Sequence, residues 1–250
     1  MCTVVVLNRP GHAWPVILGA NRDEMEDRAW EPPARHWPDR AEMVAGLDKL
    51  AGGTWLGIND FGVIAAVLNR RGSLGPKSGF RSRGELPLEA LDHADADAAA
   101  QALAALDPGS YRPFNMVIAD NVDAYWLRLA KGADGVGVSR LPSGVSMITS
   151  SDRNDLRSPR IATYLRQFEK AQEPDPETRD FESWRRPLAG RLHDPSAGPD
   201  GAMTIVTESG FATVSSSLMA LPSPDSRGRR PIWQFCPGRP GEAPFEDVEI

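Results

Sequence analysis

Residues 1–24 read MCTVVVLNRPGHAWPVILGANRDE, and this stretch decides the fold. The runs Thr3–Asn8 and Trp14–Ala20 are apolar and rich in β-branched residues, and Arg9-Pro10-Gly11-His12 between them has the composition of a turn. The pattern predicts a β-hairpin. Its second strand is expected to end at the polar residues Asn21-Arg22-Asp23-Glu24.

The rest of the chain continues in strand pairs that are interrupted by blocks of helix. The expected strands are Thr54–Asn59, Val63–Asn69, Phe114–Ala119, Ala124–Leu129, Val145–Thr149, Thr204–Thr207, Phe211–Leu221 and Ile232–Cys236. The expected helices are Glu85–Leu106, one that starts at Ser158-Pro159, and Phe181–Leu192 with a kink at Pro187. Strands in hairpins and helices in separate blocks favour an α+β fold of mostly antiparallel sheets over alternating βαβ units.

The sequence shows no internal repeat and no obvious linker, which predicts a single domain over residues 1–250. Glu31–Arg40 holds three prolines and is expected to be loop, as is the Gly-, Ser- and Arg-rich stretch Arg70–Arg83. The tail at residues 237–250 is rich in Pro and Gly and is expected to be peripheral.

Composition excludes several classes of protein. With 41% hydrophobic and 25% charged residues, the 250-residue chain can form a core and is not disordered. A net charge of −6 disfavours binding to the phosphate backbone of nucleic acid, and no apolar run is long enough to span a bilayer. Two cysteines exclude a disulfide-dense scaffold.

The first residues lack the basic start, apolar stretch and cleavage site of a secretory signal, so a cytoplasmic location is expected. Thiols stay reduced there, and Cys2 and Cys236 are predicted to be unbridged. Cysteine is small enough at the second position for Met1 to be trimmed. That processing leaves Cys2 as the first residue.

An N-terminal cysteine carries both a nucleophile and a base. The free thiol has a pKa of about 8.5, so little of it is thiolate at neutral pH, whereas an α-amino group has a pKa of about 7.7–8.0 and lies within reach of its own side chain. We therefore identify Cys2 as a candidate nucleophile.

Two polar groups are predicted to support Cys2. Asp23 follows the second strand, and its carboxylate is expected to hold the α-amino group. Asn69 ends an apolar strand, and its amide is expected to donate to an oxyanion, an interaction worth about 3 kcal/mol. The remaining candidates for substrate binding are Asn21, Arg22, Trp55 and Arg70. Trp55 lies in Gly52-Gly53-Thr54-Trp55-Leu56-Gly57, where glycines permit close backbone approach.

Met1-Cys2, the strand ending Ala20-Asn21-Arg22-Asp23-Glu24, and Gly52-Gly53-Thr54-Trp55-Leu56-Gly57 resemble the NRDE-motif family, also called transport and Golgi organisation protein 2-like. Phe114-Asn115 followed by Ala119-Asp120 is similar to a further segment of that family. The family is similar to the N-terminal-nucleophile hydrolases, and the resemblance implies a four-layer αββα sandwich. Among these hydrolases, the cysteine amidases of the bile-salt-hydrolase and acid-ceramidase kind have the nearest pattern.

By that resemblance Cys2 matches the nucleophile, Asp23 the carboxylate that holds the amine, and Asn69 the oxyanion donor. The sequence also departs from the amidases at two positions. They carry an arginine three residues before the aspartate, where this chain has Ala20, and an asparagine where Ser150 follows Thr149.

Two functions stay open on this evidence. The leading one is an N-terminal-nucleophile cysteine hydrolase that acts on a non-peptide amide or acyl bond of a small molecule. The alternative, which the resemblance implies, is a non-catalytic haem- or lipid-binding and trafficking protein on the same fold, with an apolar ligand. The four histidines show no metal-ligand spacing, so neither a metal nor another cofactor is expected.

Overall fold

The computed structural model describes residues 2–226 and 228–250, and the expected removal of Met1 lies outside them. The chain forms two compact units. The first unit consists of the residues up to Arg28 together with Pro142–Glu249, and the second of Ala29–Leu141 with the final Ile250. The chain therefore leaves the first unit after its opening hairpin and returns more than a hundred residues later.

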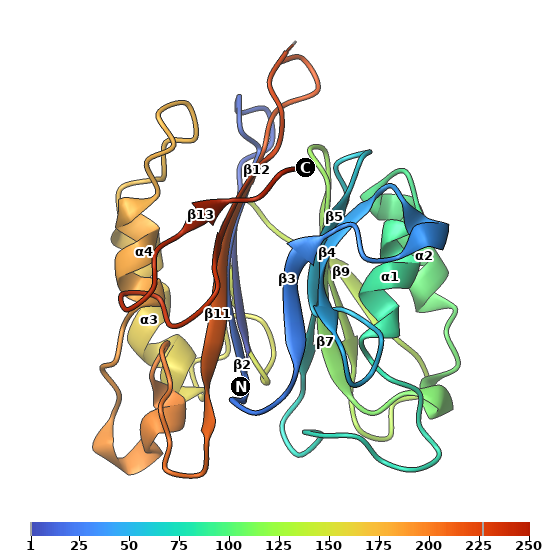
Figure 1. Cartoon of the computed structure of the whole chain (residues 1–250), viewed down its shortest axis with the longest axis vertical. Coiled ribbons are helices and arrows are strands. Elements are labelled where there is room, and N and C mark those ends of the chain that lie inside the picture. Colours follow the sequence, from blue (N-terminus) through green and yellow to red (C-terminus); the bar gives the residue numbers. More distant parts are fainter. Residues whose placement is uncertain (1, 227) are drawn as a thin grey trace. The chain divides into compact units, whose positions relative to one another are not determined.

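The first unit is an antiparallel sheet with helices on one face (Figure 1). Its strand order is β10-β1-β2-β11-β12-β13. The strands are β1 (Thr3–Asn8), β2 (Val16–Met25), β10 (Gly144–Ile148), β11 (Phe211–Leu221), β12 (Ile232–Cys236) and β13 (Glu246–Asp247). The helices are α3 (Pro159–Lys170) and α4 (Glu182–Leu188). Alternate residues of the central strands pack against these helices, among them Val5, Leu7, Ile17 and Leu218.

The predicted opening hairpin is confirmed, because β1 and β2 pair from Asn8↔Val16 to Thr3↔Asn21. The prediction that the strand ends at Ala20 is wrong. β2 continues to Met25 because β11 pairs along its other edge as far as Phe211↔Met25. The polar residues 21–24 are therefore strand residues with fixed faces.

The second unit is also an antiparallel sheet with helices on one face (Figure 1). The strands follow one another in the order β3 to β9. They are β3 (Trp30–Ala34), β4 (Met43–Asp48), β5 (Leu56–Asn59), β6 (Ile64–Asn69), β7 (Phe114–Ala119), β8 (Ala124–Leu129) and β9 (Gly137–Arg140), with helices α1 (Glu85–Leu91) and α2 (Ala96–Ala104). The core between helices and sheet includes Leu86, Leu103, Phe114 and Met116.

Three further predicted elements differ in kind from the structure. Glu31–Arg40 is not all loop, because Trp30–Ala34 forms β3 at the sheet edge, where a proline need not donate a ladder hydrogen bond. Glu85–Leu106 is two helices, since Asp95 caps the second one through a bond from the Ala98 amide. Thr204–Thr207 forms a single bridge, Val206↔Ala212, rather than a strand.

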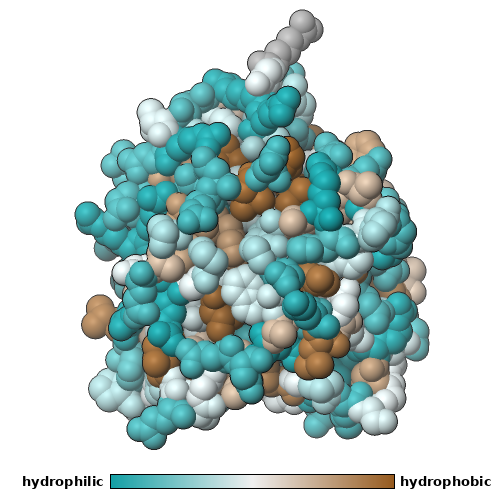
Figure 2. Space-filling view, in the orientation of Figure 1, coloured by the Kyte–Doolittle hydropathy of each residue, from teal (hydrophilic) through white to brown (hydrophobic). Residues whose placement is uncertain are grey.

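The α+β class with two antiparallel sheets is confirmed, and each unit supplies one sheet layer and one helix layer. Figure 2 shows hydrophilic residues over most of one face, with apolar residues in smaller groups between them. None of the helices in the described part of the chain is long and apolar enough to cross a membrane. The tail pairs with the sheet of the first unit through β13.

Candidate functional site

Cys2 lies one residue before β1, at the end of the sheet of the first unit. Continuing the pairing Thr3↔Asn21 by one residue places Cys2 beside Arg22. Cross-strand neighbours project from the same face, and Thr3 belongs to the other face, which α3 and α4 cover. Cys2 and Arg22 therefore share the face opposite to the helices.

The Cys2 thiol is half-buried and donates to the backbone carbonyl of Asp23, with Sγ 3.6 Å from that oxygen. Burial raises the pKa of the Cys2 thiol, and the nearby Asp23 carboxylate raises it further. A weaker opposite effect comes from the charge of Arg22. The thiol is consequently protonated at neutral pH and requires a base before it can attack.

The carboxylate of Asp23 lies on the helix-covered face and is fully enclosed. Arg160 of α3 donates to Oδ2 at 2.9 Å, and Thr213 of β11 donates to Oδ1 at 2.7 Å. The same Arg160 nitrogen donates to the Thr3 hydroxyl at 2.8 Å. The side chains of Arg160 and Asp23 are 1% and 0% exposed, which makes this a buried ion pair.

A β-bulge sets this arrangement. The pairing of β11 with β2 shifts between Thr213 and Ser215, so that Thr213 lies opposite Asp23 and Ser215 lies opposite Arg22. Bulges of this kind re-aim side chains at the ends of strands. Here the bulge brings the Thr213 hydroxyl to the Asp23 carboxylate.

Asn21 shares the helix-covered face with Asp23 and is buried. Its amide nitrogen donates to the carbonyls of Leu188 and Met203, at 2.9 and 3.0 Å, and its oxygen accepts from the Ser216 hydroxyl at 2.7 Å. The amide thus joins β2 to the end of α4. Its predicted part in substrate binding stays a prediction.

Three of the predicted site residues belong to the second unit. Asn69 is the half-buried last residue of β6, and strand alternation puts it on the face of Val67 and Ala65, which pack toward α1 and α2. Arg70 donates to the side chain of the buried Asn115 at 2.6 Å. Their predicted roles toward an oxyanion and a substrate stay predictions.

Trp55 packs within the second unit. Its ring makes an edge contact with Trp30, with ring centroids 5.8 Å apart, and it covers Gly46, where a Cβ would lie 2.3 Å from the indole. Gly53 approaches the backbone of Gly84, so that an added Cβ would meet the Gly84 carbonyl carbon at 2.4 Å. The glycine-rich segment is therefore needed for close packing, as its composition indicates.

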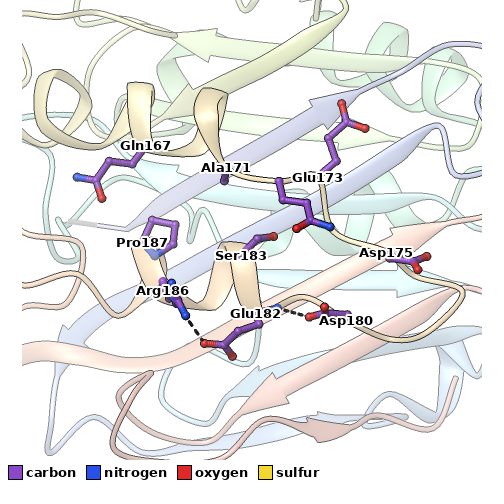
Figure 3. Close-up of a pocket in the computed structure, with 10 residues that line it drawn as sticks. Gln167, Ala171, Glu173, Asp175, Asp180, Glu182, Ser183, Arg186 and Pro187 are labelled. Carbon is purple, nitrogen blue, oxygen red and sulfur yellow. Dashed lines mark hydrogen bonds and ion pairs between the residues drawn. The ribbon is translucent and has the colours of Figure 1, made fainter.

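A pocket of about 520 Å³ lies over α3 and α4, away from the Cys2 face (Figure 3). It is lined by Gln167, Ala171, Gln172, Glu173, Asp175, Asp180, Glu182, Ser183, Arg186 and Pro187. Its carboxylates already have partners within the first unit, such as Arg9 for Glu173 and Arg186 for Glu182. No predicted site residue lines this pocket.

Sequence reasoning missed Arg160 and Thr213. Arg160 is the second residue of a helix whose buried positions are Arg160, Ile161, Tyr164, Leu165 and Phe168. The signal is present in the sequence, because an arginine four residues before Tyr164 falls on the apolar stripe of the predicted helix. Thr213 has no comparable signal, since its position depends on the bulge.

Within the described residues, no group of three or more histidine, cysteine or acidic side chains has the arrangement of a metal site. Cys2 and Cys236 are both free, as predicted. The first unit therefore holds a protonated thiol, that of Cys2, next to a buried carboxylate, that of Asp23, which forms an ion pair with Arg160. It can support nucleophilic chemistry if a base is supplied at the position of the Cys2 amine.

Residues 1–199 match a family model described as Transport and Golgi organisation 2. The mouse Transport and Golgi organization 2 homolog is 36% identical over 115 residues, which is 44% of this chain and 40% of the mouse protein. The bovine homolog is 37% identical over 118 residues, with the same coverage of both chains. The matched stretch thus covers about two fifths of the length of these relatives.

Solved structures show the fold. An N-acylethanolamine-hydrolyzing acid amidase ortholog from Caenorhabditis elegans is 14% identical with a TM-score of 0.51, covering 90% of this chain and 95% of that chain. A variant of the conjugated bile acid hydrolase from Clostridium perfringens is 14% identical with a TM-score of 0.54, covering 99% of this chain and 92% of that chain. The predicted N-terminal-nucleophile hydrolase fold is confirmed by these likenesses.

Proposed function

The chain belongs to the Transport and Golgi organisation 2 family, and we propose that it is a cysteine hydrolase of non-peptide amide or acyl bonds with Cys2 as its nucleophile. The observation that supports it most is the contact of the Cys2 thiol with the backbone carbonyl of Asp23, whose side-chain carboxylate accepts from Arg160 and Thr213 on the helix-covered face. The fold likeness to an amidase and a bile acid hydrolase supports this reaction class.

The proposed reaction begins with removal of Met1, which frees the α-amine of Cys2. The amine takes the thiol proton, and the thiolate attacks the carbonyl carbon of the substrate. The bond to the leaving group breaks as the ammonium returns the proton to it, leaving a thioester on Cys2. Water then gives a proton to the amine and attacks the thioester carbon. The C–S bond breaks, the acid is released, and the thiolate takes the proton from the ammonium, which restores the thiol and the free amine.

Asp23 is proposed to hold the α-amine in this cycle. The backbone amine of a strand lies between the two faces of the sheet, so a carboxylate on one face and a thiol on the other can both reach it. A negative carboxylate stabilises the ammonium that forms when the thiol loses its proton. In this proposal the Cys2 thiol is unreactive by itself, and its activation requires the free amine that removal of Met1 provides.

A non-catalytic haem- or lipid-binding protein is the second candidate function. The observation that favours it is that Ala20 and Ser150 stand where the amidases carry an arginine and an asparagine. In that case Cys2 is dispensable for ligand affinity. The following experiment separates the two functions.

Trimmed protein is incubated with a p-nitrophenyl acyl ester, and intact mass spectrometry follows acylation. We expect one acyl group on Cys2, release of p-nitrophenol, and loss of both in Cys2→Ala. Two controls are protein with an uncleaved N-terminal tag, which blocks the amine and should not turn over, and Cys236→Ala, which should behave as the unchanged protein because Cys236 is buried. Fully trimmed protein without an adduct at Cys2 contradicts the proposal.

A further inference from the structure

We propose that Arg160, on helix α3, is the positioning residue of the Cys2 site and acts on the thiol only through Asp23. This inference rests on the proposed function and adds to it the group that holds the Asp23 carboxylate in place. Arg160 reaches Asp23 Oδ2 at 2.9 Å and the Thr3 hydroxyl at 2.8 Å with one nitrogen. It thereby links α3 to β1 and β2 at the point where Cys2 lies.

The position of Arg160 is unfavourable for a charged side chain, and packing alone would be met by an apolar one. It is the second residue of α3, where the positive end of the helix dipole opposes a cation. Its side chain is 1% exposed, and the desolvation of a guanidinium can exceed the gain from its ion pair. An apolar side chain of similar volume is often as stable at such a position, so stability alone does not explain the arginine.

The chemistry of Asp23 does explain it. A carboxylate that is 0% exposed must find hydrogen-bond donors within the protein for both of its oxygens. Arg160 donates to Oδ2, and the Thr213 hydroxyl at 2.7 Å fixes the orientation of Oδ1. Both donors lie on the helix-covered face, so the carboxylate is fixed from the side of the sheet opposite to the Cys2 thiol.

The result is a row of alternating charge when the site is active. Arg160 is positive, Asp23 negative, the protonated α-amine positive and the Cys2 thiolate negative. Among the described residues, the charged groups that affect the pKa of the thiol directly are Asp23, which raises it, and Arg22, which lowers it. Arg160 lies behind Asp23, so its influence depends on that carboxylate.

The guanidinium that contacts Asp23 comes from a helix rather than from β2. The strand position three residues before Asp23, where the amidases carry an arginine, holds Ala20. Arg160 is 137 residues away from Asp23 along the chain. Ala20 lies on the face of Arg22, so Arg160 reaches Asp23 from the face opposite to that position.

The test uses the rate of alkylation of Cys2 by iodoacetamide against pH, read by intact mass, which needs no substrate. The full chain is compared with Arg160→Met, Arg160→Lys, Asp23→Asn and the double variant, all with an uncleaved N-terminal tag, so that no free Cys2 amine is present and the Asp23 carboxylate acts on the thiol directly. Because the Asp23 charge disfavours the thiolate, Asp23→Asn should alkylate faster at pH 7, by roughly threefold or more. Arg160→Met should change the rate in the same direction, since the Asp23 carboxylate loses the group that holds it near the thiol.

The double variant should alkylate at the same rate as Asp23→Asn alone, which shows that Arg160 acts through Asp23. Arg160→Lys should return the rate toward that of the unchanged chain. The matched control is Arg166→Met, an exposed arginine on the same helix, which should change nothing. Thermal melts of every variant establish that each one is folded at the assay temperature.

An Arg160→Met protein that is folded and keeps the original pH profile overturns the inference, as does a double variant whose effects simply add. This outcome is distinct from failure of the proposed function, which shows instead as absence of ester turnover. If the hydrolase proposal holds, trimmed Arg160→Met protein should also lose ester turnover by tenfold or more, while Cys2 of the tagged protein becomes easier to alkylate. A structural role alone does not produce that opposite pair of effects.

Discussion

At the scale of single residues, the polar run Asn21 to Glu24 divides its side chains between the two faces of one strand. Asn21 and Asp23 face the helices, whereas Arg22 lies on the face of Cys2. Each therefore meets a different environment although they are adjacent in the chain. The four residues of the motif therefore make separate contacts, although they lie on one strand.

Asn21→Ala should destabilise the protein by about 2–4 kcal/mol, because it removes three hydrogen bonds at a buried site, to the carbonyls of Leu188 and Met203 and from the Ser216 hydroxyl. Urea unfolding measures the change. Asn121→Ala, in the turn before β8, is the control and should stay within about 0.5 kcal/mol. An equally small effect of Asn21→Ala contradicts the bonding described for it.

At the scale of elements, close backbone approach is the reason for the second glycine of Gly52-Gly53. Gly53→Ala should lower the stability by about 1–3 kcal/mol, since the new methyl group meets the Gly84 backbone, which cannot move aside as a side chain can. Thermal unfolding tests this. Gly135→Ala, where a Cβ meets nothing within 4 Å, should leave the melting temperature unchanged.

The break between α1 and α2 depends on Asp95. Asp95→Ala should cost about 1 kcal/mol, because the Ala98 amide loses the carboxylate oxygen that it contacts at 2.7 Å. Chemical denaturation gives the value, with the exposed Asp134→Ala as a control for loss of a surface charge. If both substitutions have the same effect, the cap is not what starts α2.

At the scale of the whole molecule, a buried phenol makes the stability depend on alkaline pH. Burial raises the pKa of Tyr111 to about 12. An unfolded tyrosine ionises near a pKa of about 10, so above that pH the unfolded chain loses a proton that the folded chain retains, and the free energy of unfolding falls as pH rises. Tyr111→Phe removes this contribution.

As the pH rises above about 10, the free energy of unfolding of the unchanged protein should therefore fall more steeply than that of the Tyr111→Phe variant. Between about pH 9 and about pH 11 the difference between the two should change by about 1 kcal/mol in favour of the variant. Urea denaturation at both pH values measures it. A difference that does not change with pH contradicts the enclosure of Tyr111.

Local pattern was enough to predict much of this protein. The hairpin, the strands Phe211–Leu221 and Ile232–Cys236, and the α+β class follow from apolar alternation and turn residues, which act over a few neighbours in the chain. Cys2 and Asp23 also stood out, because a polar run after an apolar strand and a cysteine at the second position are visible without coordinates.

Tertiary contact decided the rest. The prolines of β3 are tolerated only because that strand forms a sheet edge, and β2 extends to Met25 only because β11 runs beside it. The clamp on Asp23 joins residues 137 and 190 positions away, and a bulge in β11 sets its geometry. Sequence alone determined which residues are candidates for the chemistry. Folding decided which face of the strand each one takes, because strand register depends on partners that lie far away in the chain.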